Sequence, residues 1–122
     1  MESIVVVSTN GIARSITDWI PSTRVAIIHA LDNLTAFNIL QSISNTKLLV
    51  ADAEVSDLPI TTFLQCVHTI PNYNTLPIVF VAQPPPTNAI DRLLKIENTY
   101  YLPKPVNKDH FLLCAEKHII QE

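Results

Sequence analysis

Short runs of β-branched and aliphatic residues alternate along this chain with amphipathic segments. Runs of this length and composition are typical of β-strands. We expect five strands, at Ser3–Ser8, Arg24–His29, Lys47–Asp52, Pro77–Ala82 and Thr99–Pro103. The first, third and fourth runs are apolar almost throughout, which is typical of strands that helices cover on both faces. The fifth contains two tyrosines and fewer aliphatic residues, so we expect it at an edge of the sheet.

The segments between and after these strands have the apolar spacing of helices. The stripe after the second strand is the broadest and consists of Leu34, Phe37, Ile39, Leu40 and Ile43. The first predicted helix, Gly11–Ile20, is short and ends before Pro21. Five strand–helix units in sequence predict a parallel sheet with helices on both faces.

Residues that favour helix starts precede the last three predicted helices. Pro59 suits a first helical turn, and Thr87 and Asn107 are residue types whose side chains cap a helix N-terminus. The apolar positions that follow are Phe63, Leu64, Val67 and Ile70, then Ile90, Leu93 and Leu94, then Phe111, Leu112, Ala115, His118 and Ile119. Right-handed crossovers and the burial pattern favour a doubly wound, flavodoxin-like α/β sheet of order 2-1-3-4-5. We expect a single domain over residues 1–122.

Composition narrows the function classes. Eleven acidic residues against eight basic ones give a net charge of −3, and no basic block is present, which argues against a nucleic-acid binder. No run reaches the length of a membrane span or a signal peptide. Cys66 and Cys114 have no metal-ligand spacing and are expected to pack in helices of a reduced, cytoplasmic protein. The four histidines do not converge in sequence, so we expect no metal site from them.

Polar residues follow the strands that should meet at one edge of the sheet. In a doubly wound sheet the crevice lies at the carboxyl ends of the first and third strands. Ser8 and Thr9 follow the first strand, Asp52 and Glu54 the third, and Lys104 the fifth. A carboxylate that ends a buried strand needs a partner, and Lys104 is the obvious one.

With these residues at these positions, the chain resembles the receiver domains of two-component response regulators. The similarity covers essentially the whole chain, with its best matches at LLVADAEVSD (Leu48–Asp57), PIVFVA (Pro77–Ala82) and YLPKP (Tyr101–Pro105). The resemblance implies that Asp52 matches the aspartate that accepts a phosphoryl group. It also implies that Lys104 is the family's lysine, that Tyr101 and Val81 occupy its switch positions, and that the Lys104–Pro105 bond is cis.

The chain departs from the family pattern where that family holds magnesium. The acidic pair of receivers is replaced by Ser8 and Thr9, and Glu54 matches a position that offers mainly a backbone carbonyl. Mg²⁺ requires carboxylate oxygens in near-octahedral geometry, so this pocket is degenerate. Val81 cannot donate the hydrogen bond that a serine or threonine gives to the phosphoryl group. We therefore expect a pseudo-receiver with no enzymatic activity, no cofactor and a direct Asp52–Lys104 ion pair.

Two alternatives stay open from the sequence. The first is a phosphoacceptor receiver that uses Asp52 with an unusual Mg²⁺ site. The second is a flavodoxin-like cofactor or anion binder that uses the hydroxyl-rich loop Ser8–Gly11, although no aromatic residue in Ala53–Pro59 could stack on a flavin.

A protein partner is the expected ligand. The resemblance implies a partner face made by the fourth helix, fifth strand and fifth helix, around Tyr101, with no role for nucleic acid or membrane. This region contains the basic residues Arg92, Lys95, Lys104, Lys108 and Lys117, which acidic residues balance. The partner could be a second copy of the chain or an output domain beyond it. Trp19 is expected to cover the edge of the core.

Overall fold

The computed structural model describes residues 2–9, 11–20, 25–84 and 88–117. Five parallel strands form one sheet in the order β2-β1-β3-β4-β5, which confirms the predicted topology. The strands are β1 (Glu2–Val7), β2 (Val25–Ala30), β3 (Thr46–Asp52), β4 (Ile78–Ala82) and β5 (Thr99–Pro103). Each lies within about one residue of its predicted range, because the short apolar runs coincide with the buried strands.

The helices alternate with the strands, as the apolar spacing predicts. They are α1 (Ile12–Trp19), α2 (Asn33–Ser42), α3 (Ile60–Val67), α4 (Asn88–Leu94) and α5 (Lys108–Glu116), with a 3₁₀ turn at Pro71–Tyr73. Asp32 and Asn107 cap α2 and α5 by accepting hydrogen bonds from the backbone N–H groups of Thr35 and His110.

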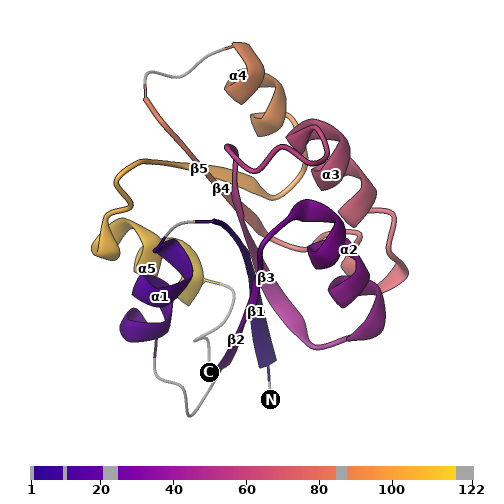
Figure 1. The fold of residues 1–122 in the computed structure, drawn as a ribbon, viewed down its shortest axis with the longest axis horizontal. Helices are drawn as coiled ribbons and strands as arrows, with labels where there is room; N and C mark the ends of the chain where they lie inside the picture. The colour runs from indigo at the N-terminus through magenta and orange to yellow at the C-terminus, as the bar shows by residue number, and fades with distance from the viewer. Residues whose placement is uncertain (1, 10, 21–24, 85–87, 118–122) are drawn as a thin grey trace.

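The sheet separates two apolar layers (Figure 1). Buried residues of α2, α3 and α4 pack on one face, together with Val5, Leu49 and Phe80. Residues of α1 and α5 pack on the other face, with Ile4, Val50 and Val81. Burial on both faces explains why β1, β3 and β4 are apolar along most of their length. Trp19 packs at the margin of the second layer with its ring 5.8 Å from that of Phe111, as predicted.

Several predictions from the helical pattern are wrong in detail. Leu34, assigned to the apolar stripe of α2, is 55% exposed, and Asn33 and Ala36 are buried in its place. Helix α3 ends at Val67, so Ile70 lies beyond it. Pro59 is the N-cap residue rather than part of the first turn. Cys66 is exposed rather than packed, because it lies on the solvent side of α3.

Some predicted features lie outside the described residues. These are Asn10 of the hydroxyl-rich loop, Thr87 as a helix cap, and His118 and Ile119 of the fifth helix. Within the described part, none of the helices is both long and apolar enough to cross a membrane.

Candidate functional site

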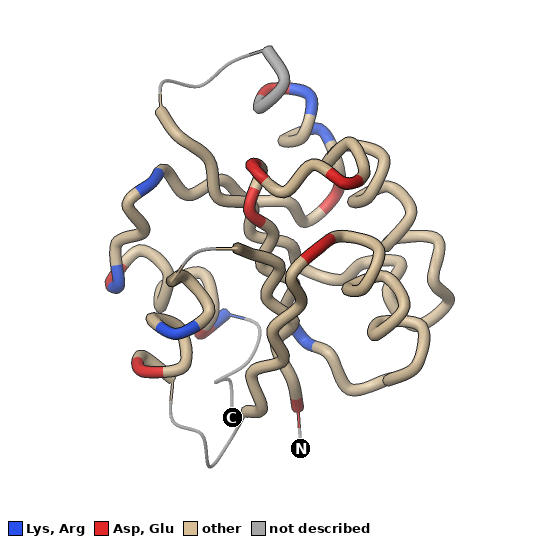
Figure 2. The backbone as a smooth tube through the Cα atoms, viewed as in Figure 1, with Lys and Arg blue, Asp and Glu red and all other residues tan. Residues whose placement is uncertain are grey.

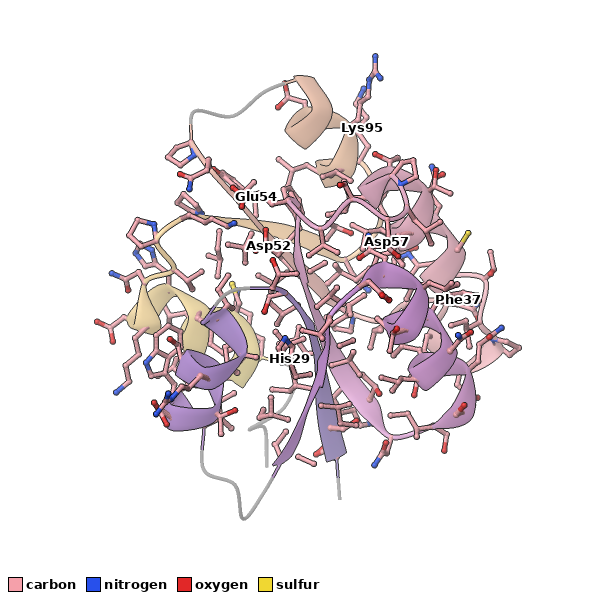
Figure 3. The ribbon with its side chains drawn as sticks, in the orientation of Figure 1. His29, Phe37, Asp52, Glu54, Asp57 and Lys95 are labelled. Carbon is pink, nitrogen blue, oxygen red and sulfur yellow. The ribbon has the colours of Figure 1, made fainter. Side chains whose placement is uncertain are left out.

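Asp52 is the last residue of β3, and its side chain is almost fully buried, with 1% exposed. The Glu54 N–H donates to Asp52 Oδ1 at 2.9 Å, which turns the chain sharply after the strand. The Ala53 N–H donates to the carbonyl of Val81 at 2.9 Å. The end of β3 is therefore fixed by its neighbour β4, and Asp52 lies at the carboxyl end of the sheet, where the topology predicts the site (Figure 3).

Lys104 reaches this carboxylate from the segment after β5. Its backbone N–H donates to the carbonyl of Ala82 at 3.0 Å, and the Lys104–Pro105 bond is cis, as the resemblance implies. The ammonium Nζ lies 2.9 Å from Asp52 Oδ1 and 3.0 Å from Oδ2. It also lies 3.2 Å from Glu54 Oε2. One cation thus contacts two carboxylates.

Asp52, Glu54 and Lys104 form a charged triad, and its electrostatics follow from burial. A buried carboxylate without a partner is costly, and the Lys104 ammonium compensates Asp52 directly. Burial alone lowers the pKa of Lys104, but hydrogen bonds to Asp52 and Glu54 and their charges outweigh it and raise the pKa. Two carboxylates and one ammonium leave a net charge of −1, and Lys104 stays protonated at neutral pH.

Ser8 and Thr9 occupy the end of β1 beside the triad. Ser8 is fully buried, and Thr9 is exposed. The His29 Nε2–H donates to the Ser8 carbonyl at 2.7 Å and lies 3.4 Å from the Ser8 hydroxyl. This contact joins the ends of β1 and β2 and requires a proton on Nε2 of His29. Ser8 is therefore engaged with β2, and this edge contributes no negative charge.

The residues at this edge do not fit the magnesium ion that receivers hold. Among the described residues, no group of three or more His, Cys, Asp or Glu side chains could hold a metal ion. Mg²⁺ needs several hard oxygen ligands in near-octahedral geometry. Both Asp52 oxygens already contact an ammonium, and Glu54, 60% exposed in its side chain, contacts the same ammonium.

Val81 and Tyr101, to which the resemblance assigns switch positions, lie on opposite faces of the sheet. Val81 is fully buried in the layer of α1 and α5. Tyr101 is half-buried on the other face, where its ring stacks on Phe80 with centroids 5.4 Å apart. Its hydroxyl donates to the Ala82 carbonyl at 3.4 Å. Tyr101 is therefore packed inward, against the core.

Asn33 and Asp57 hold the loop that follows Asp52, and the sequence analysis missed both roles. Asn33 Nδ2 donates to the carbonyls of Val55 and Leu58, at 3.2 and 3.1 Å. The Asp57 carboxylate accepts the backbone N–H groups of Asn33 and Leu34, at 2.9 and 3.0 Å. The start of α2 and the loop 53–58 are thus clamped together (Figure 3). The signal in the sequence was an Asn in the first turn of α2, where apolar spacing alone leaves no role for it.

A cavity of about 460 Å³ lies between α1 and the segment after β5. Trp19, Ile12 and Val106 form much of its apolar wall, and Ser15 and Gln83 add polar groups. Lys104 and Pro105 also line it. The wall of this cavity therefore shares Lys104 with the triad.

No model of a known protein family matches this sequence, and no curated protein matches it. Solved structures are similar to it in fold. The chemotaxis response regulator CheY4 of Vibrio cholerae matches with a TM-score of 0.82 at 16% identity, covering 96% of this chain and 98% of that one. The chain has the receiver fold. The match covers both chains almost fully, so the likeness extends over the whole sheet and its helices.

Two further receiver domains are similar. One belongs to a sensor histidine kinase of Pseudomonas aeruginosa and was solved with magnesium coordinated in its active-site cleft; it matches with a TM-score of 0.79 at 15% identity, covering 98% of each chain. The other, from a response regulator of Saccharomyces cerevisiae, was solved with a histidine phosphotransfer protein. It matches with a TM-score of 0.75 at 17% identity, covering 94% of this chain and 87% of that one.

Proposed function

We propose that this domain is a pseudo-receiver: a non-enzymatic, cytoplasmic signalling module that acts through protein contacts, without magnesium-dependent phosphorylation of Asp52. The receiver fold supports the signalling role, since solved structures of this fold include response regulators and one complex with a phosphotransfer protein. The chemistry at Asp52 supports the loss of phosphorylation.

The contact between Lys104 and both oxygens of Asp52 is the observation that carries the proposal. Transfer of a phosphoryl group to a carboxylate requires a free oxygen in line with the phosphorus atom and cations that neutralise the equatorial oxygens. In this site the one ammonium is shared by two carboxylates, and the net charge of −1 repels a phosphodonor. Ser8 and Thr9 add no carboxylate that would attract a divalent ion.

We propose that the partner surface comprises α4, β5 and α5. Helix α4 exposes Leu94, and Tyr101 of the neighbouring strand β5 is half-buried. An exposed leucine and a half-buried aromatic ring both offer apolar contact of the kind that protein interfaces use. The ion pair at Asp52 would hold this surface in one conformation, so the partner would bind without a phosphorylation signal.

The test is a titration of ¹⁵N-labelled protein with Mg²⁺ and then with beryllofluoride or acetyl phosphate. Amide shifts of Asp52, Glu54 and Lys104 should show no saturable change, and intact-mass measurement should detect no phosphoryl adduct. The magnesium-binding receiver of Pseudomonas aeruginosa, treated identically, serves as the positive control.

A saturable, Mg²⁺-dependent shift at Asp52 together with an adduct would overturn the proposal and favour the phosphoacceptor alternative. The variant Ser8→Asp/Thr9→Asp restores the acidic pair of receivers. It should bind Mg²⁺ more tightly than the natural protein, because two carboxylates are added beside Asp52.

A further inference from the structure

The cavity between α1 and the segment after β5 has the size of a small-molecule site. Its volume is about 460 Å³. Pockets that bind small molecules or cofactors commonly measure roughly 300 to 1,000 Å³. An apolar cavity of about 150 Å³ already binds benzene, so this one has room for two fused rings.

Helix α1 supplies one wall of the cavity from a single face. Ile12, Ser15 and Trp19 line it, and spacings of three and four residues place side chains on the same side of a helix. All three are half-buried. The charged residues of α1, Arg14 and Asp18, are exposed instead (Figure 2). The wall that α1 offers to a ligand is therefore neutral and mainly apolar.

Trp19 gives the cavity an aromatic wall that is already held in place. Its ring lies 5.8 Å from the ring of Phe111, tilted by 46°, and Phe111 is fully buried. Both the face and the edge of an indole attract another aromatic ring, in offset-stacked or edge-to-face contact. A wall that is ordered before binding reduces the entropy that association costs. A flat aromatic molecule is therefore the apolar ligand that this wall suits.

Ser15 and Gln83 add hydrogen-bonding groups to the cavity. A hydroxyl and a carboxamide each contain a donor and an acceptor. In the part of the chain that the structure describes, neither side chain is hydrogen-bonded to another residue. A small number of polar groups in an apolar pocket orients a ligand and makes binding specific. The suitable ring therefore has both a donor and an acceptor.

Charge decides that the ligand is neutral. Lys104 is the one ionisable side chain among the described residues that line the cavity. Its ammonium lies 2.9 Å from an Asp52 oxygen and 3.2 Å from a Glu54 oxygen, so its charge is already compensated. An anion would find no free cation here, a cation would approach the ammonium, and a buried charge without a partner is costly.

We propose that this cavity binds a neutral heteroaromatic molecule of about two fused rings with a hydrogen-bond donor and acceptor. The proposal goes beyond the signalling function and does not depend on the chemistry at Asp52. It also concerns a site other than the proposed partner surface.

A titration of the ¹⁵N-labelled full chain with four probes tests the proposal. The neutral probes are quinoline-3-carboxamide and indole-3-carboxamide, and quinoline-3-carboxylate and 3-(aminomethyl)quinoline are the matched anion and cation. The chain has one tryptophan, so the single indole N–H signal reports on Trp19 directly. A neutral probe should give saturable shifts of this signal and of Ser15 and Gln83, with a Kd of about 1 mM or lower. The charged probes should bind at least about tenfold more weakly.

Two variants locate the binding in the cavity. Ser15→Leu fills it and should weaken binding at least about tenfold, whereas Thr17→Leu, on the exposed side of α1, is the matched control. Gly11→Leu is a second filling variant in case Ser15→Leu fails to fold. Gly11 lines the cavity with φ −77° and ψ 6°, and an added Cβ would meet no atom within 4 Å. The fold should therefore accept this side chain.

The absence of a saturable shift with both neutral probes up to about 5 mM overturns the proposal. Equal affinity for neutral and charged probes overturns it as well. So does binding that is unchanged in the filling variants or that Thr17→Leu weakens equally. None of these results bears on the loss of phosphorylation, which the magnesium titration tests separately.

Discussion

The Lys104 ammonium lies 2.9 and 3.0 Å from the two carboxylate oxygens of Asp52, although 52 residues separate them in sequence. Asp52 is 1% exposed, and the side chain of Lys104 is 10% exposed. The pair is therefore buried, and its two charges depend on each other. Removal of either partner tests this dependence.

Lys104→Met should lower the free energy of unfolding by about 3 kcal/mol, because it leaves a buried carboxylate without its cation. The double variant Asp52→Asn/Lys104→Met should recover most of that loss, since no charge then remains buried. Urea denaturation of the natural protein, both single variants and the double variant gives the comparison. If Lys104→Met stayed within about 0.5 kcal/mol of the natural protein, the pair would behave like an exposed one.

The stability that Lys104 contributes should depend on pH only in the alkaline range. Burial opposes the charged form of Lys104, but its hydrogen bonds to Asp52 and Glu54 raise its pKa in the folded protein above the ordinary 10.5. A pKa that is higher in the folded state gives stabilisation that is complete below the unfolded pKa. That stabilisation is lost as the pH rises through the folded pKa.

The difference in unfolding free energy between the natural protein and Lys104→Met should therefore be constant from about pH 7 to pH 10 and decrease above it. Urea denaturation at several pH values measures this difference. Taking the difference between the two proteins cancels the pH dependence that other titrating groups, including the tyrosines, give to both unfolding free energies. A decrease already between about pH 7 and 9 would contradict a raised pKa.

Loss of the loop clamp should loosen the segment after Asp52. Asn33→Ala should cost about 1 to 2 kcal/mol, because the carbonyls of Val55 and Leu58 lose their donor. The cost stays moderate since Asn33 Oδ1, itself buried, has no hydrogen-bond partner in the structure. Asp57→Ala should cost about 1 kcal/mol, the usual effect of losing a side-chain acceptor at a helix N-terminus.

Amide hydrogen exchange tells this clamp apart from a uniform loss of stability. In Asp57→Ala, the amides of Asn33 and Leu34 should exchange much faster. The amides of β4 should exchange faster only by the amount that the lower global stability of the variant predicts. Gln41→Ala, on the exposed side of α2 and away from its start, is the control. Equal acceleration throughout the chain would show that the loop has no local dependence on Asp57.

The ring of Tyr101, rather than its hydroxyl, should contribute to stability. Tyr101→Phe keeps the stacking on Phe80 and should change the free energy of unfolding by less than about 0.5 kcal/mol, because the 3.4 Å hydroxyl contact is weak. Tyr101→Ala should cost about 2 kcal/mol, since half-buried aromatic surface is lost. Thermal unfolding of both variants measures the difference. Partner binding is therefore best tested with Tyr101→Phe, which should keep the fold intact. If Tyr101→Phe strongly lowered the free energy of unfolding, the hydroxyl rather than the ring would be the stabilising group.

The sequence by itself determined the sheet and the meeting of Asp52 with Lys104. Alternating apolar runs and helical stripes specify five strand–helix units, and right-handed crossovers leave few possible strand orders. The carboxyl ends of parallel strands share one edge, so residues that follow β3 and β5 must lie near each other. The absence of carboxylates at Ser8 and Thr9 was also visible in the sequence.

Only the tertiary structure decided which side of each helix faces the core. Apolar type alone placed Leu34 inside and gave Asn33 no role, yet Leu34 is exposed and Asn33 is buried. The reason is that Asn33 donates to two loop carbonyls and Asp57 accepts a backbone N–H at the helix start. These contacts orient α2 so that Asn33, Ala36 and Leu40 face the core. Hydrogen bonds between segments 22 to 25 residues apart set this orientation, and no local periodicity reports them.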